Sequence, residues 1–161
     1  MHPEEPRLAE AAQKVVEALK RHGPTAIYLF GSAVTGPLHP GSDLDLAVLF
    51  PPHKRLTTRE KGTLAAGAED AAGIAVDLVF LAEARLPVQF EVVRNGRVLW
   101  EQSPDARTDF EEAVLRQYMD FEPLLRRSYQ EMLQDVLGKE EPPCRTTNQP
   151  TTKPSSGSAQ P

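Results

Sequence analysis

The sequence of 161 residues lacks features that mark several specialised classes of protein. Its single cysteine, Cys144, excludes a disulfide framework and a cysteine-based zinc site, so we expect a reducing, cytoplasmic location. The sequence has no run of about 18 apolar residues, the length that a membrane-spanning helix needs. The first residues also lack the pattern of a secretion signal. Lys and Arg total 18 against 23 Asp and Glu, a net charge of -5, which argues against direct nucleic-acid binding.

The remaining composition is that of one soluble domain with a polar tail. Hydrophobic residues make up 40% of the chain and charged residues 25%. Residues 139–161 are rich in Pro, Thr and Ser and hold almost no side chain able to join a core, so we expect them to be disordered. We divide the rest into a core over 1–102 and C-terminal helices over 103–138.

Helical and strand patterns alternate in the first hundred residues. Apolar residues at helical spacing predict a helix over 6–21, and Thr57 with Glu60 forms a candidate capping box for a second helix ending near Ala72. A short helix is expected over 87–94. Short apolar or alternating runs predict strands over 26–30, 43–50, 75–81 and 97–100. Helices and sheet therefore share one core, in an α+β fold of the two-layer α/β kind.

A helical pattern also follows the last predicted strand. Ser103 and Pro104 supply an N-cap and a first-turn proline, and apolar residues continue at helical spacing to about residue 121. Pro123 is expected to kink or restart the helix. The apolar stripe beyond it, Leu125 to Val136, is expected to pack on the core or on a partner, or to join copies of the chain in a homo-oligomer.

The residues that carry chemistry lie between the first two predicted strands and on the third. Gly31 allows close backbone approach, Ser32 adds a hydroxyl, and a helical turn starting there would direct N–H groups toward an anion such as a triphosphate. Asp43 and Asp45 face one side of a strand because they are two residues apart. Two carboxylates repel unless a cation lies between them, and Mg²⁺ fits such a site. Asp77 joins them if its strand is a neighbour.

These residues resemble the signature of the DNA polymerase beta-like nucleotidyltransferases: Gly31-Ser32, ten residues, then Asp43-Leu44-Asp45, with Asp77 on a later strand. The chain is similar over roughly 6–137 to the minimal nucleotidyltransferases, in particular to the antitoxin branch that partners HEPN-domain toxins. The resemblance implies a polymerase beta-like core with a small mixed sheet, flanking helices and a helical C-terminal extension. It implies nucleotide binding by Gly31 and Ser32, Mg²⁺ ligation by Asp43 and Asp45, and a second ion and a base at Asp77.

The activity implied by the resemblance is transfer of AMP from ATP to a tyrosine hydroxyl of a cognate HEPN toxin, with two Mg²⁺ ions as cofactors. Such a protein acts as an antitoxin. Two alternatives use the same core. One is transfer of AMP to a small molecule such as an aminoglycoside, although such enzymes resemble this core with a larger acceptor-binding domain attached. The other is a non-catalytic antitoxin that inhibits its toxin by occlusion.

Other polar and aromatic residues are candidates for the same site. Lys54, Arg55 and Lys61 follow the second strand and could contact phosphates, but a solvated loop and helix start is the favoured interpretation. His39 and His53 show no metal-ligand pattern and receive no role. The tyrosines of the apolar helical stripe are explained more simply by packing than by nucleotide stacking.

Overall fold

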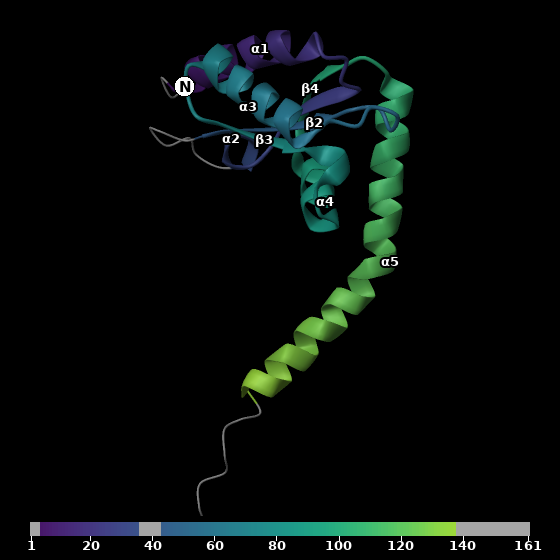
Figure 1. Cartoon of the computed structure of the whole chain (residues 1–161). Helices are drawn as coiled ribbons and strands as arrows, with labels where there is room; N and C mark the ends of the chain where they lie inside the picture. Colours follow the sequence, from purple (N-terminus) through teal and green to yellow (C-terminus); the bar gives the residue numbers. More distant parts are fainter. Residues whose placement is uncertain (1–3, 36–42, 138–161) are drawn as a thin grey trace, which may run out of the picture. The chain divides into compact units, whose positions relative to one another are not determined.

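A computed structural model describes residues 4–35 and 43–137 of the chain (Figure 1). The predicted tail at 139–161 and His39 lie outside the described residues. The elements are α1 (Glu4–Lys20), β1 (Ala26–Leu29), α2 (Ser32–Thr35), β2 (Leu44–Leu49), α3 (Thr58–Ala72), β3 (Val76–Phe80), a 3₁₀ turn η1 (Leu81–Glu83), α4 (Leu86–Asn95), β4 (Arg97–Glu101) and α5 (Pro104–Leu137). The longer helices and all four strands were predicted from the sequence, whereas η1 was not.

The four strands form one mixed sheet in the order β3-β2-β1-β4. β1 is antiparallel to both of its neighbours, β2 and β4, while β2 and β3 run parallel. The parallel pair is connected through α3, because a strand can return to a parallel neighbour only by a crossover. This arrangement is the small mixed sheet with flanking helices that was expected from the sequence.

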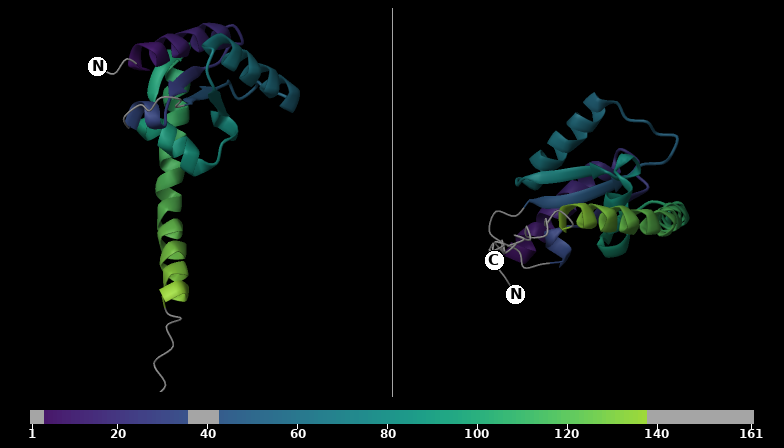
Figure 2. Two further views of the ribbon diagram at one scale, coloured as in Figure 1. Left: turned by 90° about the vertical axis from the view of Figure 1, so that its left-hand side faces the viewer. Right: turned by 90° about the horizontal axis from the view of Figure 1, so that it is seen from below.

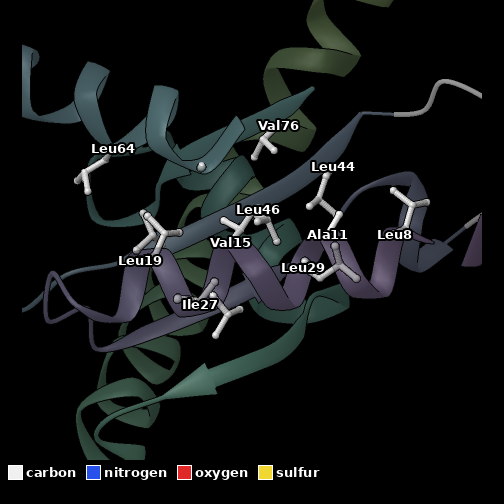
Figure 3. Close-up of a cluster of buried hydrophobic side chains, with 14 of the residues drawn as sticks. Leu8, Ala11, Val15, Leu19, Ile27, Leu29, Leu44, Leu46, Leu64 and Val76 are labelled. Carbon is white, nitrogen blue, oxygen red and sulfur yellow. The ribbon is translucent and has the colours of Figure 1, made fainter. Parts of the chain in front are cut away.

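Two apolar clusters cover the two faces of the sheet. On one face, α1 and α3 pack against the strands, and Figure 3 shows Val15 of α1 next to Leu46 of β2, with Leu8 and Leu19 toward the two ends of the same cluster. The other face carries a smaller cluster that includes Tyr28 of β1 and Val92 of α4. Figure 2 (left) shows α1 and α3 above the strands and α4 below them. The strands therefore alternate between the two clusters residue by residue.

The capping box predicted at the start of α3 is present. The Thr57 side chain accepts a hydrogen bond from the Glu60 backbone N–H, and the Glu60 carboxylate accepts one from the Thr57 backbone N–H at 2.7 Å. α3 then ends at Gly73, whose φ of 67° is in the left-handed region that favours glycine. The crossover helix between β2 and β3 is thus bounded by local sequence signals at both ends.

A polar network ties the first turns of α5 to the sheet. The Tyr28 hydroxyl, on a residue only 1% exposed, donates to Glu111 of α5 at 3.0 Å. The Arg107 guanidinium pairs with two carboxylates. It lies 2.5 Å from Glu101 at the end of β4 and 2.7 Å from Glu111. Burial and the Glu111 charge raise the pKa of Tyr28, while the two carboxylates raise that of Arg107. Both side chains therefore hold the protonated form that the network requires.

Pro123 lies inside the C-terminal helix. α5 runs from Pro104 to Leu137 with this proline within it, so the helix does not restart as a separate element there. The kink expected at Pro123 stays a prediction. By its contacts the chain divides into residues 1–123 and residues 124–161, so the turns of α5 from 104 to 123 belong with the core. In the first unit Tyr118 stacks on Phe90 of α4, with ring centroids 3.6 Å apart, which is packing as expected.

No helix within residues 4–35 and 43–137 is both long enough and apolar enough to cross a membrane. The side chains of Leu125, Tyr129 and those from residue 132 onward lie outside the described part of α5.

Replacing Arg107 by alanine should lower the free energy of unfolding by about 2 kcal/mol, because two partly buried carboxylates lose their shared cation. Arg127→Ala is the matched control, since Arg127 pairs with Glu131 one helical turn away at 3.0 Å but is 79% exposed. That change should cost less than about 0.5 kcal/mol. Urea unfolding of both variants measures the difference, and equal losses would contradict a structural role for the network.

Candidate active site

The residues singled out in the sequence meet at one end of the sheet, where β1 ends and β2 begins. β2 and β3 pair in the register that places Asp45 opposite Asp77. Side chains at paired positions of parallel strands point to the same face, so the two carboxylates share the face that carries Ala47 and Val79. Asp43 is exposed and directly precedes β2. Gly31 and Ser32 follow β1, which is the antiparallel neighbour of β2 on its other side.

Alternation along β2 explains why Asp45 faces this side. Leu44, Leu46 and Val48 point to the opposite face, where each is at most 1% exposed. Burial of these three side chains leaves Asp45 on the face of the smaller cluster, where it is only partly buried. The sequence predicted this alternation, and the structure adds that β3 is the neighbour that supplies Asp77.

Gly31 is required at its position by its contact with Asp45. Its φ is +70°, a conformation that residues with a side chain rarely adopt. A Cβ at this position would lie 2.9 Å from Cγ of Asp45, which is closer than real contacts allow. The sequence suggested that Gly31 lets a ligand approach the backbone, and the structure shows a second reason for glycine: it makes room for a carboxylate.

Ser32 begins the single turn of α2, and its backbone forms a hydrogen bond to the Asp45 carboxylate. The pKa of Asp45 is nevertheless raised, first by burial and then by the negative charges of Asp77 and Asp43. The hydrogen bond from Ser32 opposes this shift. The hydrogen bond from Ser32 therefore offsets only part of the repulsion among the carboxylates. A bound cation would relieve the rest.

The carboxylates alone do not form a complete metal site. Within the described ranges, no three His, Cys, Asp or Glu side chains are arranged to hold an ion by themselves. A divalent cation would take further oxygen ligands from water or from a bound phosphate, as Mg²⁺ commonly does. The donor atoms are all hard carboxylate oxygens, so they fit Mg²⁺ when water or a phosphate supplies the remaining ligands.

Three basic residues considered for phosphate binding lie elsewhere. Lys54 and Arg55 follow the carboxyl end of β2, whose last residue lies about 13 Å along the strand from Asp45 at roughly 3.3 Å per residue. The Lys54 ammonium donates to the backbone oxygen of His22, and Lys61 pairs with Glu83. These contacts agree with the favoured interpretation of a loop and a helix start.

A mixed sheet with flanking helices, and three carboxylates beside a glycine-serine turn at one end, define a nucleotidyltransferase of the polymerase beta type. The family model described as polymerase beta, nucleotidyltransferase, matches residues 13–105. The chain belongs to this family. No curated protein sequence matches it.

Solved structures narrow the similarity to the MNT antitoxins. One similar chain, 31% identical with a TM-score of 0.62, comes from a toxin–antitoxin complex with AMP-PNP and is matched over 97% of its length and 78% of this chain. Another, from the MntA–HepT complex, is 28% identical with a TM-score of 0.58, covering 79% of this chain and 97% of its own. A third is 26% identical with a TM-score of 0.60, covering 81% and 98%, from a tri-AMPylated Shewanella oneidensis HEPN toxin in complex with its MNT antitoxin.

Gly31→Ala should destabilise the protein more than Gly73→Ala. Both glycines have a positive φ near 70°, but nothing lies within 4 Å of a Cβ built on Gly73. Alanine at residue 73 therefore lowers the free energy of unfolding only by the backbone strain, about 1 kcal/mol. Alanine at residue 31 must also displace the Asp45 side chain, so it costs more. Urea unfolding compares the two variants, and an equal loss would show that the contact with Asp45 is unimportant.

Asp45→Asn should stabilise the metal-free protein at neutral pH. Since folding raises the pKa of Asp45, ionisation of this carboxyl costs stability as pH rises through its pKa, and asparagine avoids the cost while keeping an acceptor oxygen for Ser32. The gain should vanish in acid, where the wild-type carboxyl is protonated. Thermal unfolding in EDTA across pH tests this, with Asp70→Asn on the exposed side of α3 as control. A variant less stable than wild type at neutral pH would contradict the repulsion.

Proposed function

We propose that this chain is an Mg²⁺-dependent adenylyltransferase that transfers AMP from ATP to a tyrosine hydroxyl of a cognate HEPN toxin and thereby acts as an antitoxin. The observation that carries the proposal is the parallel register of Asp45 and Asp77 beside Asp43 and the Gly31-Ser32 turn. Similarity to a chain from a toxin–antitoxin complex with AMP-PNP supports ATP as the donor. Similarity to the partner of a tri-AMPylated HEPN toxin supports the acceptor.

Asp43, Asp45 and Asp77 are the residues that would hold two Mg²⁺ ions. Bound Mg²⁺ supplies charge neutralisation for the phosphates and lowers the pKa of the attacking hydroxyl. The residues fit this task because their oxygens are hard ligands, and because burial and then the charges of Asp77 and Asp43 raise the pKa of Asp45, an effect that a bound cation offsets. The Gly31-Ser32 turn would hold the nucleotide phosphates next to them.

The chain's own residues account for the remaining steps. The acceptor hydroxyl oxygen forms a bond to the α-phosphorus as the bond from that phosphorus to pyrophosphate breaks, so AMP moves and pyrophosphate leaves. Asp77, which is exposed on β3, accepts the hydroxyl proton on its carboxylate. Exposure of Asp43 and Asp77 leaves this side of the site open to an acceptor presented by another protein.

A protein acceptor also suits the surface of α5. The turns of this helix up to residue 123 carry exposed apolar side chains, among them Met119 at 70% and Phe121 at 41% exposure. Apolar side chains exposed on one element are typical of interaction surfaces. We assign the partner toxin to this surface, which could alternatively join two copies of the chain. We place the activity in the cytoplasm, where ATP is available and a lone cysteine stays reduced.

Occlusion without catalysis is the second candidate function, and it is favoured by the incomplete metal site in the described part of the chain. Under occlusion, the carboxylates would not matter for inhibition of the toxin. Transfer to a small molecule remains the other alternative, and it needs an acceptor-binding domain beyond the family match at 13–105.

The double variant Asp43→Asn, Asp45→Asn should stay folded but show no detectable AMP transfer, because both proposed metal ligands lose their charge. The assay incubates the chain with labelled ATP, Mg²⁺ and a candidate HEPN-domain toxin, and mass spectrometry locates AMP on the toxin. Asp70→Asn should transfer at the wild-type rate. Transfer by the double variant would overturn the two-metal mechanism, and an unlabelled but silenced toxin would establish occlusion.

A further inference from the structure

Two adjoining hollows lie around the loop between β2 and α3. The first, of about 200 Å³, is formed by the end of β2, this loop, the end of β3 and η1. The second, of about 260 Å³, lies between the end of α1 and the first turns of α3. Both are lined by Lys54 and Leu56, so they flank the same two side chains. We call this pair of hollows the loop groove.

Cations outnumber free anions in the loop groove. Lys54, Arg55 and Arg59 line it, with Glu83 in the first hollow and Glu60 in the second. Both carboxylates are already engaged: Glu83 pairs with Lys61, while Glu60 accepts from the backbone and hydroxyl of Thr57, each at 2.7 Å. Arg55 and Arg59 are exposed, and within the described ranges neither forms an ion pair with a carboxylate.

The floor of the groove is apolar. Val48, Phe50 and Phe80 line the first hollow together with Pro51 and Pro52. Leu64 and Leu56 line the second. A floor of this kind below a cationic rim suits a ligand that carries both apolar side chains and negative charges.

The aromatic rings of the floor are not available for base stacking. Lys54 lies over the Phe50 ring at 5.0 Å from its centroid, and Lys61 lies over Phe80 at 5.7 Å. Both rings also pack on the apolar cluster under α1 and α3. Single-stranded nucleic acids bind through open aromatic faces, and the lysines cover both of these rings. Carboxylates with aliphatic neighbours fit better than nucleotides.

We propose that the loop groove binds an acidic peptide segment of a protein partner. Its carboxylates pair with the guanidinium groups of Arg55 and Arg59, and an apolar side chain between them rests on the floor near Leu56. The groove lies at the opposite end of β2 from Asp45, so the segment and a nucleotide bind without competition. The proposal does not depend on adenylyl transfer.

Fluorescence anisotropy with a short fluorescein-labelled peptide of alternating Glu and Leu tests the site on the full chain. We expect saturable binding that weakens with added salt, and a loss of about tenfold or more in the double variant Arg55→Glu, Arg59→Glu. The control, Arg7→Glu with Arg116→Glu, changes the net charge equally at exposed positions of α1 and α5. It should bind within about twofold of wild type.

Three results would overturn the proposal. One is an absence of saturable peptide binding, and a second is an equal loss in both charge-reversal pairs, which would indicate an effect of net charge alone. The third is tighter, Arg55- and Arg59-dependent binding of a single-stranded RNA oligonucleotide of equal charge. Thermal unfolding of each variant and its affinity for ATP should match wild type, so that loss of peptide binding reports the groove. A negative result here leaves adenylyl transfer untouched, because that assay needs neither arginine.

Discussion

The register of β2 with β3 is the constraint on which the site depends. A slip of one residue would turn Asp77 toward the face that α1 and α3 cover. It would also bring Val76 and Leu78 out of the larger cluster. The free energy gained by burying the leucines and valines of the two strands therefore also holds the carboxylates together. Packing of the larger cluster on one face of the sheet thus positions the two carboxylates on the opposite face.

Two clusters of charge in this protein follow opposite rules. Around Arg107, one guanidinium pairs with Glu101 and Glu111, and Tyr28 donates a hydrogen bond to Glu111. Each charged group of this network therefore has a partner within it. Around Asp45, the neighbouring charges are those of Asp77 and Asp43, and a backbone hydrogen bond from Ser32 offsets only part of the repulsion. Closed networks stabilise a fold, whereas uncompensated like charges are typical of sites that bind a counter-ion.

The two ends of the parallel strand pair also differ in charge. The starts of β2 and β3 carry the carboxylates, while the loop and helix that follow β2 carry Lys54, Arg55 and Arg59. A net charge of -5 for the whole chain hides this separation. Since exposed charges act over about 8 Å at physiological salt, each end presents its own sign to a partner. The acidic end suits a cation with a nucleotide, and the basic end suits carboxylates.

Local patterns in the sequence determined the helices, the strands, the capping box at Thr57 and the face on which Asp45 lies, because periodicity and capping depend on neighbours in the chain. The Gly31-Ser32 and Asp43-Leu44-Asp45 spacing also indicated the family. Only the tertiary structure decided that β3 pairs with β2 opposite Asp45 and that Gly31 makes room for that carboxylate. Those features depend on which distant segments pack together, and the burial that decides this is shared across the whole core.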